Sequence, residues 1–227
     1  QEVNAAIEGA FEAGAKQIIV NDSHGTMRNI IPEELNEMVE LITGSPKPLS
    51  MMQGIDLTFN AAFFVGYHAM RGAYRGVLEH TYHGNVVSDV FFNGKRFGET
   101  GMNAAVAGYY KVPVALVTGD QAVIEEARLL LGKVETVTVK EGISRNAAKC
   151  LSPIKARHLI KAGAKNALLK VKSFKPLILN PPINLEMVFI NAGLADVAEM
   201  VPSAKRKDGR TVSFVADNYL EAYKAAR

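Results

Sequence analysis

Three short apolar runs constrain the fold of this chain more than any other feature of its sequence. They are QIIVND (residues 17–22), AAFFVGY (61–67) and PVALVT (113–118). Continuous runs of this length, rich in β-branched and aromatic residues, are typical of strands that are buried on both faces of a parallel sheet. Helical patterns lie between them, and strands that alternate with helices favour a parallel sheet. We therefore expect the first part of the chain to adopt an α/β fold.

The second part of the chain has a different pattern. A long helical stretch is followed by the proline-rich segment NPPIN at residues 180–184. After this segment the sequence predicts a strand, a helix, a second strand and a final helix, an order that is typical of a small α+β domain. We therefore expect two domains. Residues 1–145 would form a mostly parallel-sheet α/β domain with a metal site, and residues 146–227 a smaller α+β domain.

Three shorter segments give local predictions of secondary structure. Pro32 is placed as the first residue of a helix over 32–41. Residues 76–82 and 86–92 are predicted to be two extended strands that pair with each other. The segment SRNAAKCLSP (144–153) is interpreted as a small-residue helix that buries Cys150.

The chain begins inside a helical pattern. Val3, Ile7 and Ala10 recur at helical spacing, and Gly14 ends the pattern. A parallel α/β domain normally has a strand before such a helix. We therefore expect the natural protein to carry a strand upstream of Gln1.

Composition excludes several classes of partner. The chain has 227 residues, with 26 basic against 23 acidic side chains and a net charge of +3, which is too mild to indicate a nucleic-acid or membrane-surface protein. No stretch approaches the roughly 20 apolar residues of a membrane span. The single cysteine cannot form an internal disulfide, which favours a reducing compartment, and we expect a cytoplasmic protein.

Histidines follow two of the apolar runs. His24 lies just beyond the first run and His68 directly after the second. A single histidine at such a position is more often a capping or core residue. Two of them at the carboxyl ends of parallel strands, where ligands bind in open α/β sheets, are expected to share one crevice. Glu99, between glycines in FGETG, is either a helix-start acid or a metal ligand, and its spacing does not separate the two. Imidazole with carboxylate suits zinc, so a metal-assisted hydrolase is the first hypothesis.

His80 and His83 are three residues apart in an apparent strand, so their side chains are expected to point to opposite faces. Only one of them is therefore expected to enter the site, where a histidine beside a metal can act as general acid or base. His158, in the long helix, is expected to be exposed and uninvolved. HExxH, P-loop, GxSxG and Rossmann glycine signatures are all missing.

Six segments, read together, resemble one known family. They are VNDSHG, GSPKPLSMMQGID, FVGYHA, GVLEHTY, NGKRFGETGMNAAVAGYYKVPVALVTGD and SRNAAKCLSP. Their order and spacing are similar to those of the zinc-dependent D-aminopeptidases, first labelled the dipeptide transport protein A family, over nearly all of the chain. The resemblance implies a dinuclear zinc site and removal of N-terminal residues from short peptides, with D-amino acids preferred in the founding member. It also implies a homo-oligomer, a large decamer-like ring whose sites face an enclosed space.

The resemblance also implies roles for individual residues. His24, His68 and Glu99 match metal ligands of the family, and His80 matches the histidine with a catalytic role beside the metals. His83 has no counterpart. The family begins with a strand that ends in Asp-Met-Glu-Gly, whose two acids bind the metals, and this motif is absent here. Either that segment lies upstream of Gln1, or the chain cannot hold both zinc ions.

Three functional hypotheses follow. The first is a zinc metallo-aminopeptidase that acts on short peptides, including those with D-residues. The second is an amidase that uses the same site on a non-peptide substrate. The third is a non-catalytic oligomeric scaffold whose metal site is incomplete.

Overall fold

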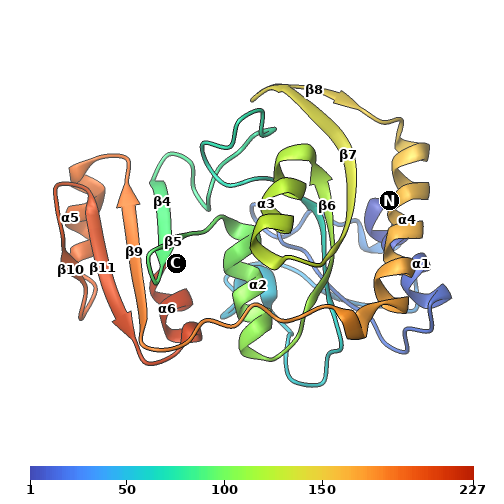
Figure 1. Ribbon diagram of the computed structural model, residues 1–227, viewed down its shortest axis with the longest axis horizontal. Helices are drawn as coiled ribbons and strands as arrows, with labels where there is room; N and C mark the ends of the chain where they lie inside the picture. Colours follow the sequence, from blue (N-terminus) through green and yellow to red (C-terminus); the bar gives the residue numbers. More distant parts are fainter.

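The computed structural model describes all 227 residues, which form six α-helices and eleven strands (Figure 1). The central sheet has four strands in the order β3-β6-β7-β8. Its members are β3 (Ala62–Tyr67), β6 (Val114–Asp120), β7 (Glu135–Ser144) and β8 (Ala147–Cys150). The first three run parallel, and β8 returns antiparallel to β7. Every residue of β6 is buried, which is the environment that its apolar run predicts. The second and third runs are thus confirmed as strands of a parallel sheet.

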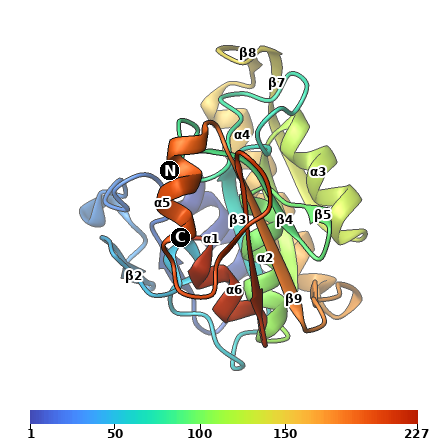
Figure 2. The same ribbon diagram turned by 90° about the vertical axis from the view of Figure 1, so that its left-hand side faces the viewer.

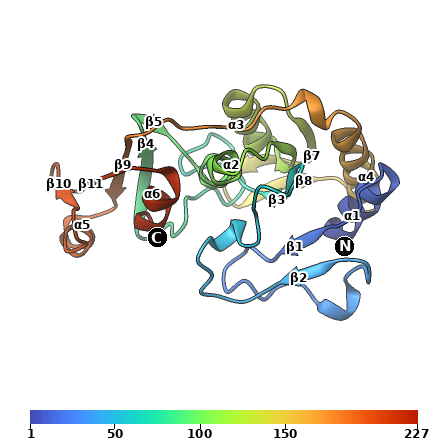
Figure 3. The same ribbon diagram turned by 90° about the horizontal axis from the view of Figure 1, so that it is seen from below.

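The first apolar run forms β1 (Ile19–Asn21), which pairs in parallel with β2 (Glu40–Ile42) in a sheet of its own. Figure 3 shows this small sheet as a separate layer below β3. The helix predicted over 32–41 is wrong, because only Pro32–Glu34 form a single 3₁₀ turn (η1) before the chain extends into β2. Pairing with the backbone of β1 outweighs the weak local preference for helix.

Helices cover both faces of the central sheet. On one face lie α1 (Glu2–Glu12) and α4 (Pro153–Leu169), and on the other α2 (Glu99–Tyr109) and α3 (Gln121–Leu131). The backbones of α1 and α4 approach so closely that a Cβ on Gly9 would lie 2.1 Å from the Lys161 carbonyl oxygen. This contact requires glycine. None of the helices combines the length and the apolar composition that a membrane span requires.

A second, antiparallel sheet has five strands in the order β10-β11-β9-β4-β5. Its members are β4 (Val87–Phe92), β5 (Lys95–Arg96), β9 (Ile183–Phe189), β10 (Lys205–Arg206) and β11 (Thr211–Ala216). Figures 2 and 3 show α5 (Ala192–Glu199) and α6 (Tyr219–Ala225) on the same face of this sheet. The strands and helices that were expected after NPPIN are confirmed.

The α/β fold class is confirmed, and the division at residue 145 stays a prediction. The five-stranded sheet contains strands of both segments, because β4 from the first segment pairs with β9 from the second. In addition, α4 from the second segment packs against α1 from the first. Two local predictions are wrong. Residues 76–82 form a loop, since β4 takes β9 as its partner, and residues 147–150 form β8, on which Cys150 is exposed.

Candidate metal centre

Three side chains meet at the carboxyl end of β3. The Nε2 atoms of His68 and His80 lie 3.5 and 3.8 Å from Oε1 of Glu99, and one ligand atom from each of the three lies within 4.8 Å of the other two. His68 directly follows β3, Glu99 is the first residue of α2, and His80 comes from the loop before β4. Three elements that are distant in sequence thus supply two imidazoles and one carboxylate, a donor set that suits zinc.

Backbone carbonyls orient both imidazoles. Nδ1 of His68 lies 3.0 Å from the Ala69 carbonyl oxygen, and Nδ1 of His80 lies 2.6 Å from that of Leu78. A carbonyl can only accept, so each Nδ1 must carry the proton and donate it. In the neutral rings this leaves the Nε2 lone pair free on the side that faces Glu99. Outer hydrogen bonds of this kind are what hold metal-binding histidines in position.

The two rings are stacked on each other. Their centroids are 3.9 Å apart, and their planes differ by 18°. Nearly parallel rings with Nε2 on the same side direct their lone pairs side by side. Such lone pairs do not converge on one ion at the Zn–N distance of about 2.0–2.1 Å. The stacked geometry therefore suits an arrangement in which one histidine binds the ion and the other lies beside it. It suits less well an arrangement in which both histidines bind the same ion.

Glu99 is a buried carboxylate without a lysine or arginine partner. The residue is 6% exposed, its Oε1 accepts a 2.8 Å hydrogen bond from the Tyr82 backbone N–H, and the only basic side chains within 4 Å of it are the two histidines. A buried carboxylate is costly unless a cation or several donors compensate it. The residues present therefore fit a metal cation.

Two further buried carboxylates, Asp120 and Glu126, support the loops that carry the histidines. Oδ2 of Asp120 accepts from the Val77 N–H at 2.5 Å, and Oε2 of Glu126 accepts from the Met70 N–H at 2.7 Å. Both acids belong to the β6–α3 unit. Sequence reasoning missed both. Glu126 lies on an amphipathic helix, whose pattern gives no signal that this acid faces inward, and Asp120 is the last residue of β6, where it resembles an ordinary helix cap.

Burial raises the pKa of the Glu126 carboxyl from its ordinary 4.5 to about 7; the Met70 hydrogen bond opposes this shift, and the negative charges of Glu99 and Asp120 add to it. At pH values below 4.5 the group is protonated in both states. Between about pH 4.5 and 7 only the unfolded chain releases the proton, so the free energy of unfolding falls across this window.

We predict that Glu126→Gln removes this decrease in the free energy of unfolding with rising pH. Relative to the wild type, the metal-free variant should gain about 3 kcal/mol in its free energy of unfolding between pH 4.5 and pH 8. Denaturant titrations at a series of pH values measure this. Glu125→Gln, an exposed neighbour, is the control. An unchanged pH dependence in the Glu126 variant would show that its carboxyl ionises normally.

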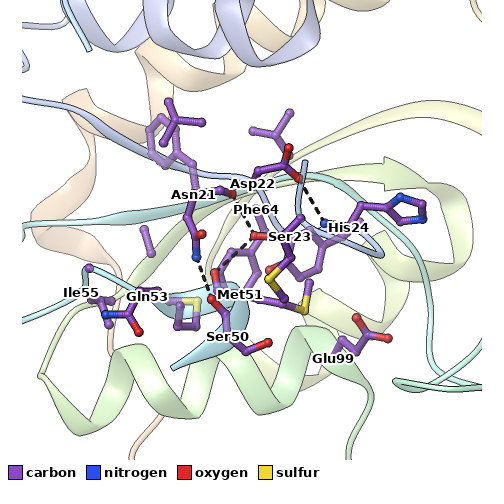
Figure 4. Close-up of a pocket in the computed structure, with 18 of the residues that line it drawn as sticks. Asn21, Asp22, Ser23, His24, Ser50, Met51, Gln53, Ile55, Phe64 and Glu99 are labelled. Atoms are coloured by element: carbon purple, nitrogen blue, oxygen red, sulfur yellow. Dashed lines mark hydrogen bonds between the residues drawn. The ribbon is translucent and has the colours of Figure 1, made fainter. Parts of the chain in front are cut away.

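His24 lies apart from the three-residue group. Its side chain is exposed, and it lines the cavity that also contains His68, His80 and Glu99. Figure 4 shows the His24 ring and the Glu99 carboxylate toward the same side of the pocket. The structure thus brings His24 to the predicted crevice without placing it among the ligand atoms that meet, and its role as a ligand stays a prediction.

The segment that carries His24 is anchored by Asp22. Burial by itself would raise the pKa of this carboxyl, but hydrogen bonds from Asn29, Ile30 and the His24 N–H outweigh it and lower the pKa below its ordinary value. The buried Lys47 ammonium donates to the Asp22 carbonyl oxygen at 2.7 Å. The end of β1 is therefore held by buried polar contacts.

The other two histidines lie outside the group. His83 is exposed and lines the same cavity, and His158 is exposed on α4. Only one of the His80 and His83 pair joins Glu99, as predicted, although the reason differs. Both lie in a loop whose turns separate them, and strand alternation plays no part.

The cavity has a volume of about 1890 Å³ and extends between β1 and β3. β1 pairs only with β2, and β3 pairs only with β6, so each has one edge without a strand partner. Residues 18–21 and 60–68 both line the space between these edges. The candidate ligands His68 and Glu99 therefore lie at the end of an open groove.

A model of the D-aminopeptidase family matches residues 1–227. The chain belongs to this family. It is 43% identical over 228 residues to a D-aminopeptidase of Bacillus subtilis (strain 168), an alignment that covers 99% of this chain and 82% of the relative. A solved structure, described as the Zn-dependent D-aminopeptidase DppA from Bacillus subtilis, a self-compartmentalizing protease, superposes with a TM-score of 0.97 at 42% identity. It covers 99% of this chain and 82% of that one. The family resemblance that the six segments indicated is confirmed.

The three side chains that meet in this structure lie in segments that carry the resemblance to the D-aminopeptidase family. The group of His68, His80 and Glu99 comes from three of the six segments, FVGYHA, GVLEHTY and the one that contains FGETG. These segments are therefore joined in space as well as in sequence order.

Proposed function

We propose that this protein is a zinc-dependent aminopeptidase that removes N-terminal residues, including D-amino acids, from short peptides. One observation carries the proposal: two imidazoles with free Nε2 atoms meet a buried carboxylate that has no lysine or arginine partner. The membership of the chain in the D-aminopeptidase family and the zinc dependence of the superposed structure support it.

The roles of the residues follow from their chemistry. His24, His68 and Glu99 would hold zinc, which when bound polarises a carbonyl and lowers the pKa of water. His80, whose Nε2 faces the same space, would stabilise the developing oxyanion or pass a proton to the leaving amine. Its Nδ1–H bond to the Leu78 carbonyl keeps Nε2 available for this transfer.

Two zinc ions need more ligands than these residues provide. A zinc site takes about four ligands, of which a catalytic site leaves one position open. Three ligand residues cannot satisfy two ions, so the dinuclear site requires further carboxylates. The unpaired edges of β1 and β3 would accept one extended segment between them, and its end would lie beside the ligands.

The proposal also includes the oligomeric state and the cellular compartment of the protein. A homo-oligomeric ring that encloses the sites would admit short peptides and exclude folded proteins. The self-compartmentalizing description of the superposed structure supports an oligomer. The one cysteine, Cys150, is free and exposed, which supports a reducing compartment such as the cytoplasm.

The test is metal removal followed by a substrate panel. The purified protein is stripped with a chelator, its zinc content is measured, and hydrolysis of D- and L-alanyl dipeptides and alanyl amides is followed before and after zinc is added back. We expect activity to disappear with the metal and to return with it. Hydrolysis of amides but of no peptide would favour the amidase hypothesis. Absence of bound zinc together with absence of turnover would favour the scaffold.

A further inference from the structure

A second, smaller cavity lies on the outer side of His80. It has a volume of about 380 Å³ and is lined by seven residues: Leu78, His80, Tyr82, His83, Gly84, Asn85 and Arg145. Three of these, His80, Tyr82 and His83, also line the large cavity that contains the metal ligands. The small cavity, here called the Arg145 cleft, therefore adjoins the candidate metal centre at these three residues.

Arg145 is the one side chain with a permanent charge among the seven residues that line the cleft. No aspartate or glutamate is among them, and the Arg145 guanidinium forms an ion pair with Glu79, which lies outside this set. His83 and Asn85 are exposed, so the cleft opens to solvent. A cleft of this kind favours an anionic group that arrives from solution.

The Arg145 guanidinium keeps part of its hydrogen-bonding capacity free. Its Nε and Nη2 face Glu79, at 3.2 Å from Oε1 and 3.4 Å from the carbonyl oxygen, and Nη1 reaches Asn146 only at 3.4 Å. Five N–H groups are available on a guanidinium, so one on each Nη has no protein partner. The side chain is 54% exposed. The free N–H groups on the two Nη atoms can donate to the oxygens of a carboxylate.

We propose that the Arg145 cleft binds the C-terminal carboxylate of the substrate, which makes di- and tripeptides with a free carboxyl end the preferred substrates. This inference rests on the proposed aminopeptidase function. His80 acts at the scissile bond, and one extended residue spans only about 3.3–3.6 Å. The carboxylate of a dipeptide must therefore lie close beside His80, which is where the cleft begins.

Arg145 also supports the His80 loop, and this second role must be separated from binding. Besides its contacts with Glu79, its backbone carbonyl accepts from the Leu78 N–H at 2.8 Å. A purely structural role would lower activity on every substrate equally. A carboxylate-binding role would lower it on peptides with a free carboxyl end and spare the corresponding amides.

The experiment compares D-alanyl-D-alanine with its C-terminal amide, and the L,L pair likewise, on the zinc-loaded protein. We expect the wild type to favour the acid over the amide by at least about tenfold in kcat/KM, mostly through KM. Arg145→Met should bring this ratio close to one, and Arg145→Lys should keep part of it. Arg128→Met, which removes an exposed arginine of α3 that contacts only Thr136, should leave the ratio unchanged.

Two results would overturn the inference: a wild-type ratio near one, or an equal loss on acid and amide in Arg145→Met. Calorimetric titration with the same acid and amide separates this inference from the proposed function. If the protein hydrolyses neither compound but binds the acid more tightly than the amide, and Arg145→Met loses this difference, the carboxylate-binding role of the cleft is supported and the peptidase function is rejected. Equal binding of both compounds would reject the cleft whether or not turnover occurs.

Discussion

Replacement of His80 by alanine is expected to lower kcat for alanyl dipeptides by about 10²- to 10⁴-fold while the zinc content stays that of the wild type. The reason is geometric. The His80 ring is stacked on that of His68, and its free Nε2 faces Glu99, so it lies beside the two proposed ligands, where it can transfer a proton or stabilise charge. Steady-state kinetics and elemental analysis of the same samples test both parts of this prediction.

Two matched variants sharpen the result for His80. His80→Phe keeps a ring against His68 but removes both nitrogens, so it should lose activity as fully as His80→Ala with less disturbance of the stack. His158→Ala removes an exposed histidine of α4 and should change neither activity nor zinc content. Loss of zinc from both His80 variants would make His80 a ligand and contradict its role as a proton-transfer group.

Glu99→Gln is expected to weaken zinc binding by more than the roughly 10- to 100-fold that loss of an outer-shell partner costs, and to abolish activity at limiting zinc. Glutamine keeps an oxygen that can accept from the Tyr82 N–H, so the loop should hold its position. The variant removes the negative charge that the two histidines face and leaves their neighbourhood neutral. Competition with a chromogenic chelator measures the affinity.

Controls for Glu99 come from the same structure. Glu125→Gln makes the same chemical change on an exposed part of α3 and should bind zinc normally. His24→Ala, measured in the same titration, tests whether the histidine outside the three-residue group is also a ligand. Wild-type zinc affinity in Glu99→Gln would show that this carboxylate is only a helix-start acid.

Much of the fold could be predicted from local pattern. The apolar runs that became β3 and β6 and the helical spacing of α1 are strong signals, because burial on both faces or on one stripe leaves its mark in the residues themselves. β2 and β8 could not be predicted in this way. Each has only three or four residues, too few to show a periodic pattern, and each is a strand only because a neighbouring strand supplies hydrogen bonds to it.

The candidate site, too, could be predicted only in part from the sequence. His24 and His68 were expected in one crevice, whereas the spacing of Glu99 did not separate a metal ligand from a helix-start acid. The structure places Glu99 beside His68, and His24 lines the same cavity outside this group. His80 was expected from the family resemblance, but its stacking on His68 depends on a loop that Asp120 and Arg145 hold in place. No residue pattern within that loop indicates this arrangement.

By itself, the sequence determined the strand-forming runs, the family and the set of side chains that can bind zinc. These depend on residue type and local spacing, which are properties of the sequence and do not change with the way in which the chain packs. Only the tertiary structure decided which of those side chains meet, that His24 stays outside the group, and that Arg145 lines a cleft beside His80. Such distances depend on how separate elements pack, as when β4 pairs with β9 about one hundred residues away. That packing is a property of the whole chain, and no single motif encodes it.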